Sequence, residues 1–266
     1  MEKLAAILGL LLVAGCAGEM DKQSEVEKLR ILALSADPPE IQPGEGATFR
    51  ALWADPEGKG RDVTFAWMAC AGPFEPGAMC EPAMPPVVRS ASEGGDAFVV
   101  PVAPALDPTV MLVVRAGGET VTAMKRVTVS RSGTPNHNPG IEKLVLNGKA
   151  LEPADDGGVA TVKCTADDGC PDAEVQVFLT KESFETYETQ GLGGVEMKTD
   201  QLYVSWFVVG GEADKTRTGA GEPGEPLKMT WSLPEEGGEL TLYVVAHDTR
   251  GGVSWKRYAV KAAAAR

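Results

Sequence analysis

The residues that could do chemistry are few in this chain of 266 residues, which has five cysteines and two histidines. Imidazole is the usual group in proton transfer and in nucleophilic triads, so the histidines come first. His137 lies in a stretch rich in Pro, Asn and Gly, and His247 precedes Asp248 in a predicted terminal hairpin. No GxSxG, GxxxxGK[ST] or HExxH pattern occurs. We therefore predict no catalytic residue, no cofactor and no enzymatic activity.

The N-terminus has a charged start, an apolar run and a small-residue cleavage site. Lys3 precedes the apolar residues 4–14, a run shorter than the roughly 20 residues of a membrane-spanning helix. This organisation is typical of a secretory signal peptide. The segment Val13-Ala14-Gly15-Cys16 resembles the lipobox of bacterial lipoproteins, which implies diacylglycerol on Cys16, cleavage before it and acylation of the new amino group. The alternatives are an ordinary signal peptide and a short transmembrane anchor.

The lipoprotein resemblance also implies a location in the cell. Two or more acyl chains hold a protein stably at a membrane, whereas one gives marginal binding. Lipoproteins retained at the inner membrane often carry Asp after the lipidated cysteine, but here Ala17 follows it. We therefore expect attachment to the outer membrane through Cys16, with the protein facing either the periplasm or the cell surface. Within the lipidated tether, 16–28, residues 19–28 are polar and would give it a short reach.

The remaining cysteines agree with an oxidising compartment. Once Cys16 is acylated, Cys70, Cys80, Cys164 and Cys170 form two local pairs, one in each half of the chain. Four cysteines allow three pairings, and only Cys70–Cys80 with Cys164–Cys170 places no disulfide bond between the two halves of the chain. A zinc site is the alternative, but no CxxC spacing or nearby histidine supports it.

Net charge excludes some partners. The chain carries −13 at neutral pH, and both halves are acidic. Binding of nucleic acid needs clustered Lys and Arg to neutralise phosphates, and no basic stripe is present. An anionic membrane surface is disfavoured for the same reason. The acidity indicates solubility in an extracytoplasmic space.

Many short strands are the main structural signal. Val63, Phe65 and Trp67 alternate with small or polar residues, which is the period of a half-buried strand. Thirty-one Gly and nineteen Pro supply frequent turns. Further strands are expected at 29–36, 48–53, 97–102, 110–116, 121–130, 144–146, 159–164, 174–179, 202–209, 227–232, 239–247 and 253–262. One segment, 181–189, is predicted as a short helix because Phe184 and Tyr187 lie three residues apart.

The two halves of the chain resemble each other. FAWMACAG at 65–72 matches VSWFVVGG at 204–211, and Gly117-Gly118 and Gly251-Gly252 both suit hairpin turns. Residues 131–140 lack periodicity and mark a boundary. The predicted parts are a signal peptide (1–15), a lipidated tether (16–28), a first domain (29–130), a linker (131–140) and a second domain (141–266).

Such ladders of short antiparallel strands resemble immunoglobulin-like or polycystic-kidney-disease-type domains. The fold class expected is all-β, with two tandem immunoglobulin-like antiparallel sandwiches. The resemblance places Trp67 and Trp206 in the cores, between the two sheets of each sandwich. The inter-sheet disulfide of antibody domains is missing. The Pro-Gly turn after the first strand, with Trp67 and a following Cys, is similar to uncharacterised lipoproteins of myxobacteria.

Acidic turns are the one place where a metal ion could bind. Asp155-Asp156 and Asp167-Asp168 flank a predicted strand, and Asp172 follows them. Calcium takes six to eight oxygen ligands, which paired Asp residues can supply. The DxDxDG spacing of an EF-hand is absent, however, and acidic turns are common in an acidic protein. We predict no metal site and keep calcium as the alternative.

Aromatic residues near the C-terminus could form a carbohydrate-binding patch. Trp255, Tyr243, Tyr258 and Arg250 are close in sequence. Because side chains alternate along a strand, Trp255 and Tyr258 must face opposite sides, so at least one of the aromatics belongs to the core. Packing within the hairpin is the alternative.

These observations favour a non-enzymatic protein of the cell envelope that binds a protein partner or acts as a scaffold. Loops on a rigid framework usually carry recognition, which directs attention to 70–80, 164–170 and the hairpin tip 248–252. The alternatives are a structural spacer and a carbohydrate-binding or accessory module.

Overall fold

A computed structural model of the chain describes residues 22–42, 45–58, 60–70, 86–100, 109–129, 134–163, 170–191 and 193–263. Strands make up most of these residues, and the helical elements among them are three single 3₁₀ turns, Ala91–Glu93, Ala154–Asp156 and Lys181–Ser183. The expected fold class, two tandem β-sandwiches, is confirmed. The helix predicted at 181–189 is wrong beyond its first turn, because Thr186–Gly191 is a strand.

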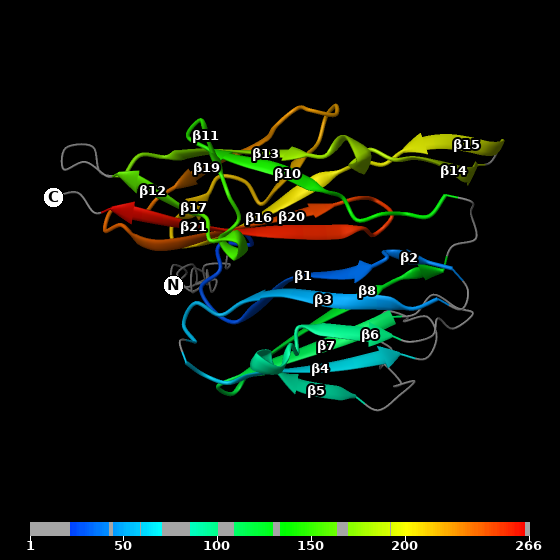
Figure 1. Cartoon of the computed structure of the whole chain (residues 1–266), viewed down its shortest axis with the longest axis horizontal. Coiled ribbons are helices and arrows are strands. Elements are labelled where there is room, and N and C mark those ends of the chain that lie inside the picture. Colours follow the sequence, from blue (N-terminus) through cyan, green and yellow to red (C-terminus); the bar gives the residue numbers. More distant parts are fainter. Residues whose placement is uncertain are drawn as a thin grey trace, which may run out of the picture.

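The first sandwich has one sheet ordered β1-β3-β6 and another ordered β5-β4-β7-β8 (Figure 1). A short parallel pair, β2-β9, forms a separate two-stranded sheet. The strands are β1 (Arg30–Asp37), β2 (Glu40–Ile41), β3 (Ala47–Ala54), β4 (Val63–Cys70), β5 (Val87–Ser90), β6 (Ala97–Val100), β7 (Thr109–Ala116), β8 (Glu119–Arg126) and β9 (Thr128–Val129).

The second sandwich has five-stranded sheets ordered β11-β10-β13-β19-β17 and β12-β21-β20-β16-β18. A separate hairpin, β14-β15, belongs to neither sheet. The strands are β10 (Ile141–Leu146), β11 (Lys149–Leu151), β12 (Val159–Lys163), β13 (Ala173–Leu179), β14 (Thr186–Gly191), β15 (Gly194–Thr199), β16 (Tyr203–Val209), β17 (Glu212–Ala213), β18 (Arg217–Gly219), β19 (Leu227–Ser232), β20 (Gly238–His247) and β21 (Val253–Ala263).

The two repeated tryptophans occupy equivalent core positions. Trp67 on β4 and Trp206 on β16 are 1% and 0% exposed. Each lies opposite an apolar residue of the neighbouring antiparallel strand, Leu112 on β7 and Val244 on β20. The predicted core roles of both tryptophans are therefore confirmed.

The sandwiches pack against each other through the outer faces of two sheets. Leu32, Ala33 and Leu52 from β1 and β3 form one buried cluster with Tyr243 and Val245 from β20. Figure 1 shows the resulting stack, with β1 and β3 beneath β20 and β21. Because both faces of β20 are covered, its sequence reads as a continuous apolar run and does not alternate.

The N-terminal segment also adds to this assembly. The backbone N–H of Val26 donates to the carbonyl of Val208 at 2.9 Å, and the Val208 N–H donates to the carbonyl of Ser24 at 2.8 Å. Ser24 and Val26 are both buried, and Lys22 forms an ion pair of 2.6 Å with Glu212. Residues 22–28 of the expected tether are thus docked on the second sandwich.

We expect Trp206→Ala to lower the free energy of unfolding by about 3–5 kcal/mol, because it removes a fully buried ring and leaves a cavity. Urea denaturation measures the change. Val159→Ala is the control, since Val159 is 63% exposed and its truncation should cost less than about 0.5 kcal/mol. Equal losses for the two variants would contradict the core assignment.

Candidate functional site

The turn between β20 and β21 is built around a buried carboxylate. Asp248 is 6% exposed, and its Oδ1 accepts hydrogen bonds from the backbone N–H groups of Arg250 at 2.9 Å and Gly252 at 2.7 Å. Its Oδ2 accepts a bond of 3.1 Å from the amide of Asn136. A Cβ on Gly252 would lie 2.1 Å from Asp248 Oδ2 and 2.9 Å from the His137 carbonyl oxygen. Only glycine fits this contact between turn and linker.

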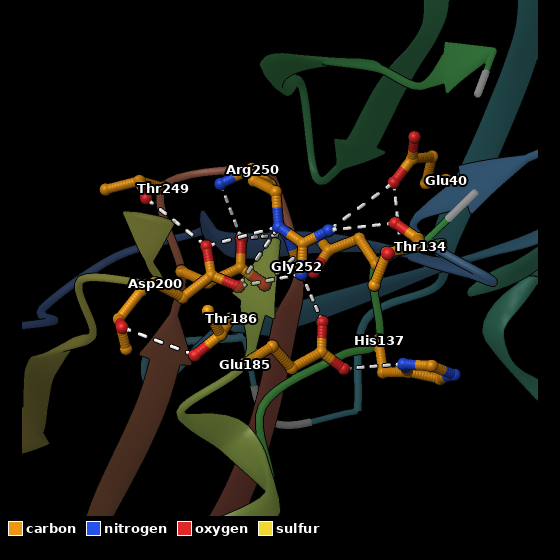
Figure 2. A network of polar contacts seen from close by, with 12 residues as sticks. Glu40, Thr134, His137, Glu185, Thr186, Asp200, Thr249, Arg250 and Gly252 are labelled. Carbon is orange, nitrogen blue, oxygen red and sulfur yellow. Dashed lines mark hydrogen bonds and ion pairs between the residues drawn. The ribbon is translucent and has the colours of Figure 1, made fainter. Parts of the chain in front are cut away.

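Arg250 projects from this turn into a cluster of carboxylates (Figure 2). Its Nε and Nη2 donate to the two oxygens of Asp200 at 3.2 and 2.8 Å, and Nη2 also donates to Glu185. Nη1 lies 3.7 Å from Glu40 Oε2 and donates to the Thr134 carbonyl at 3.4 Å. The Arg250 side chain is 13% exposed and that of Asp200 is 1% exposed. This is therefore a buried ion cluster whose charges depend on one another.

The partners of Arg250 come from separate parts of the chain. Glu40 belongs to β2 of the first sandwich, and Thr134 belongs to the linker. Glu185 immediately precedes β14, and Asp200 immediately follows β15. The Asp200 N–H donates to the Glu185 carbonyl at 2.8 Å. One guanidinium thus joins the first sandwich, the linker, the base of the β14-β15 hairpin and the second sandwich. We call this cluster the Arg250 junction.

The described part of the linker, 134–140, is also tied to both sandwiches. The Asn138 amide donates to the Ala36 carbonyl at 2.8 Å, while its Oδ1 accepts a bond of 2.8 Å from the Val253 N–H. Ser254 donates to the Pro139 carbonyl. The linker therefore connects two packed domains and is no free hinge. The hairpin tip 248–252, expected among the recognition loops, contributes a buried carboxylate and guanidinium to the Arg250 junction.

The histidines do not form a catalytic site with the described residues. His137 is exposed and lies 2.5 Å from Glu185. His247 stacks on Tyr203 with ring centroids 4.5 Å apart, and its Nε2 lies 3.2 Å from the hydroxyl of Ser205, which is 5% exposed. Burial, with the charges of Arg217 and Lys125, lowers the pKa of His247 to about 4. The Ser205 hydroxyl that contacts His247 is therefore largely shielded from solvent.

The acidic turns form no metal cluster in the part of the chain that the structure describes. Asp155 bonds to Arg257 at 2.6 Å, and Asp167-Asp168 lie outside the described residues. One glycine pattern, GAGEPG at 219–224, has the GxGxxG spacing of a dinucleotide loop. It leads from β18 to β19, with no helix after it, so the phosphate-binding helix end of that motif is missing.

The cysteines are described only in part. Cys70 and Cys170 are each disulfide-bonded. The expected partners Cys80 and Cys164, and the expected lipidation site Cys16, lie outside the described residues, so the pairings and the lipidation stay predictions. Among the described residues, no helix is long and apolar enough to cross a membrane.

A groove opens between the sandwiches, and neither histidine is among its lining residues. It has a volume of about 430 Å³ and is lined by Trp53 of β3 and by Tyr243 and Trp255 of β20 and β21. Two residues of the expected aromatic patch are therefore together. The other two are elsewhere, because Tyr258 is fully buried in the core and Arg250 forms the junction. Sequence reasoning missed Trp53, for which an apolar run at 51–54 was the only signal.

No family model matches the chain, and no curated protein matches it. Among solved structures, the D0-D1 domain of intimin is 12% identical with a TM-score of 0.26, over 88% of this chain and 96% of that one. The tandem Ig repeats of Dlar are 12% identical with a TM-score of 0.26, over 90% and 100% of the two chains. Likeness at this level assigns no function, which must come from the sites.

We expect Arg250→Met to lower the free energy of unfolding by about 3–5 kcal/mol, since it leaves Asp200 buried without its counter-ion. Amide exchange at 186–199 should become faster as the hairpin base loosens. Thermal melting and hydrogen exchange measure the two effects. Arg257→Met is the matched control, because its ion pair with Asp155 is exposed and worth less than about 1 kcal/mol. Similar effects of both changes would contradict the junction.

His247 should make the protein acid-sensitive. Its pKa falls from 6.5 to about 4 on folding, so the unfolded chain takes up the proton first as the pH drops. The stability due to neutral His247 is fully present above about pH 6.5 and is lost as pH falls toward about 4. Urea denaturation across this range should show a shallower pH dependence for His247→Gln, by about one proton. Parallel curves for wild type and variant would contradict this assignment.

Proposed function

We propose that the protein is a non-enzymatic binding or scaffold component of a bacterial cell envelope, held at the outer membrane by lipid on Cys16. In this proposal it presents a rigid β-hairpin arm to a protein partner. The arm is the hairpin β14-β15, residues 186–199. The observation that carries the proposal is the exposure of this arm together with its fixation by the Arg250 junction.

The arm projects from the second sandwich (Figure 1, upper right). All six residues of β15 are exposed, and its strands pair only with each other. Val195 and Met197 are 62% and 61% exposed, and they share one face because they are two residues apart. An isolated two-stranded hairpin is marginally stable in water, so a persistent arm needs support at its base.

The Arg250 junction supplies that support. Arg250 binds Glu185 and Asp200, the residues that flank the arm, and its guanidinium lies 4.4 Å from the centre of the Tyr187 ring. The arm is thus held in a fixed direction relative to the second sandwich. Its apolar face and open strand edges suit a partner that adds an extended segment to the hairpin.

The docked N-terminal segment limits how far the body of the protein can lie from the membrane. If Cys16 carries the lipid, residues 17–21 alone separate it from the docked Lys22. A fully extended chain of that length spans about 20 Å. The protein would therefore lie close to the membrane, and its position would be set by the body of the molecule more than by a long tether.

Cross-linking in intact cells, followed by affinity purification and mass spectrometry, tests this function. We expect wild type to recover one partner in near-equal amount and the double variant Val195→Lys, Met197→Lys to lose it. Val159→Lys, at an exposed position of β12 outside the arm, should retain it. Cys16→Ser should release the protein from the membrane fraction.

Two outcomes would contradict the proposal. The same partner recovered with the arm variant would place recognition elsewhere. A diffuse set of abundant envelope proteins, unchanged by the arm variant, would favour a spacer of fixed length, the alternative that the packed sandwiches also suit.

A further inference from the structure

The five tryptophans fall into two classes. Three are fully buried, and the indole N–H of each donates a hydrogen bond to an oxygen: Trp67 to Gly95 at 2.7 Å, Trp206 to Thr218 at 2.9 Å and Trp231 to Gly210 at 2.9 Å. Trp53 and Trp255 are partly exposed, and neither indole N–H has a hydrogen-bond partner among the described residues. The first class serves the cores. Trp53 packs edge-on against Phe65 of the first core, with ring centroids 5.5 Å apart, whereas Trp255 packs beside the cluster between the sandwiches and has ring surface and a donor left for a ligand.

Trp53 and Trp255 come from different sandwiches yet line the same groove. Tyr243 lies there too, and burial raises the pKa of its phenol above the ordinary value of 10. Its hydroxyl makes no hydrogen bond with the described residues. We call this site the aromatic groove. Its volume of about 430 Å³ is that of a small-molecule site, and domain interfaces are common places for such sites.

The charged residues that line the aromatic groove nearly cancel. Asp55 is paired with Arg61 at 2.6 Å, and Asp155 is paired with Arg257 at 2.6 Å. That leaves Arg50 and Asp96, which carry opposite charges and form no ion pair with any other described residue. A ligand there meets both hydrogen-bond donors and acceptors but no net charge of one sign.

We propose that the aromatic groove binds a neutral saccharide. A pyranose ring has an apolar C–H face that packs on an aromatic ring, and its hydroxyl groups both donate and accept hydrogen bonds. Trp255 supplies the ring, while Tyr243, Arg50 and Asp96 supply polar partners. A purely apolar ligand would leave these polar groups buried and unpaired, which is costly. An anionic ligand would meet three carboxylates against two guanidinium groups in the lining of the groove.

This inference goes beyond the proposed function, since the arm and the aromatic groove are separate surfaces. The test uses isothermal titration calorimetry and tryptophan fluorescence on the folded chain with maltohexaose, cellohexaose, chitohexaose and mannohexaose. Hexagalacturonate is the anionic comparison. We expect at least one neutral probe to bind and to change the fluorescence. Hexagalacturonate should bind more weakly than that probe.

Variants then locate the binding site. We expect Trp255→Ala to weaken binding at least about tenfold and Trp255→Phe to retain part of it. Phe178→Ala is the matched control, because Phe178 is also a partly exposed aromatic of the second sandwich, but it lies against Lys143 and outside the groove. It should leave the affinity unchanged. Tyr243→Phe and Arg50→Ala test the polar contacts with little risk to folding.

The proposal is overturned if no neutral probe binds at millimolar concentration, or if hexagalacturonate binds more tightly than all of them. It is also overturned if Trp255→Ala, Tyr243→Phe and Arg50→Ala each keep the wild-type affinity while circular dichroism shows a native fold. None of these results would alter partner capture by the arm, so the two proposals fail independently.

Discussion

The interaction on which the rest of the structure depends is the desolvated ion cluster between Arg250 and the carboxylates of Asp200, Glu185 and Glu40. Removing Arg250 leaves the nearly fully buried Asp200 without its counter-ion, so the guanidinium must be in place for the carboxylates of the cluster to be buried together. Because those segments belong to the first sandwich, the hairpin arm and the second sandwich, the cluster couples their positions. Packing of the apolar outer faces buries surface between the sandwiches, and the Arg250 junction fixes the relative orientation of the segments that it connects.

Much of the fold could be predicted from local patterns. Period-two alternation, Gly-rich turns and the repeated tryptophan strand are short-range signals, and they lead correctly to two sandwiches with Trp67 and Trp206 in the cores. The helix expected at 181–189 failed for a physical reason. Phe184 and Tyr187 are three residues apart, but the chain enters β14 at Thr186, and Tyr187 packs on Arg250.

The sites were harder to predict because they depend on contacts between distant segments. Glu40, Asp200 and Arg250 have no sequence pattern in common, so nothing local shows that they meet. Arg50 and Trp255 likewise come to the same groove only because the outer faces of two sheets pack. The single local sign of that packing is the unbroken apolar run in β20, which indicates a strand buried on both faces.

If the Arg250 junction and the packed outer faces act as inferred, both sandwiches and the arm form one rigid body. Residual dipolar couplings of backbone amides in weakly aligned protein test it most directly, because each rigid body reports its own alignment tensor. We predict that amides of β4, β7, β16 and β20 fit a single tensor with the relative orientation seen in the structure. Two tensors of different magnitude for the two sandwiches would contradict the account.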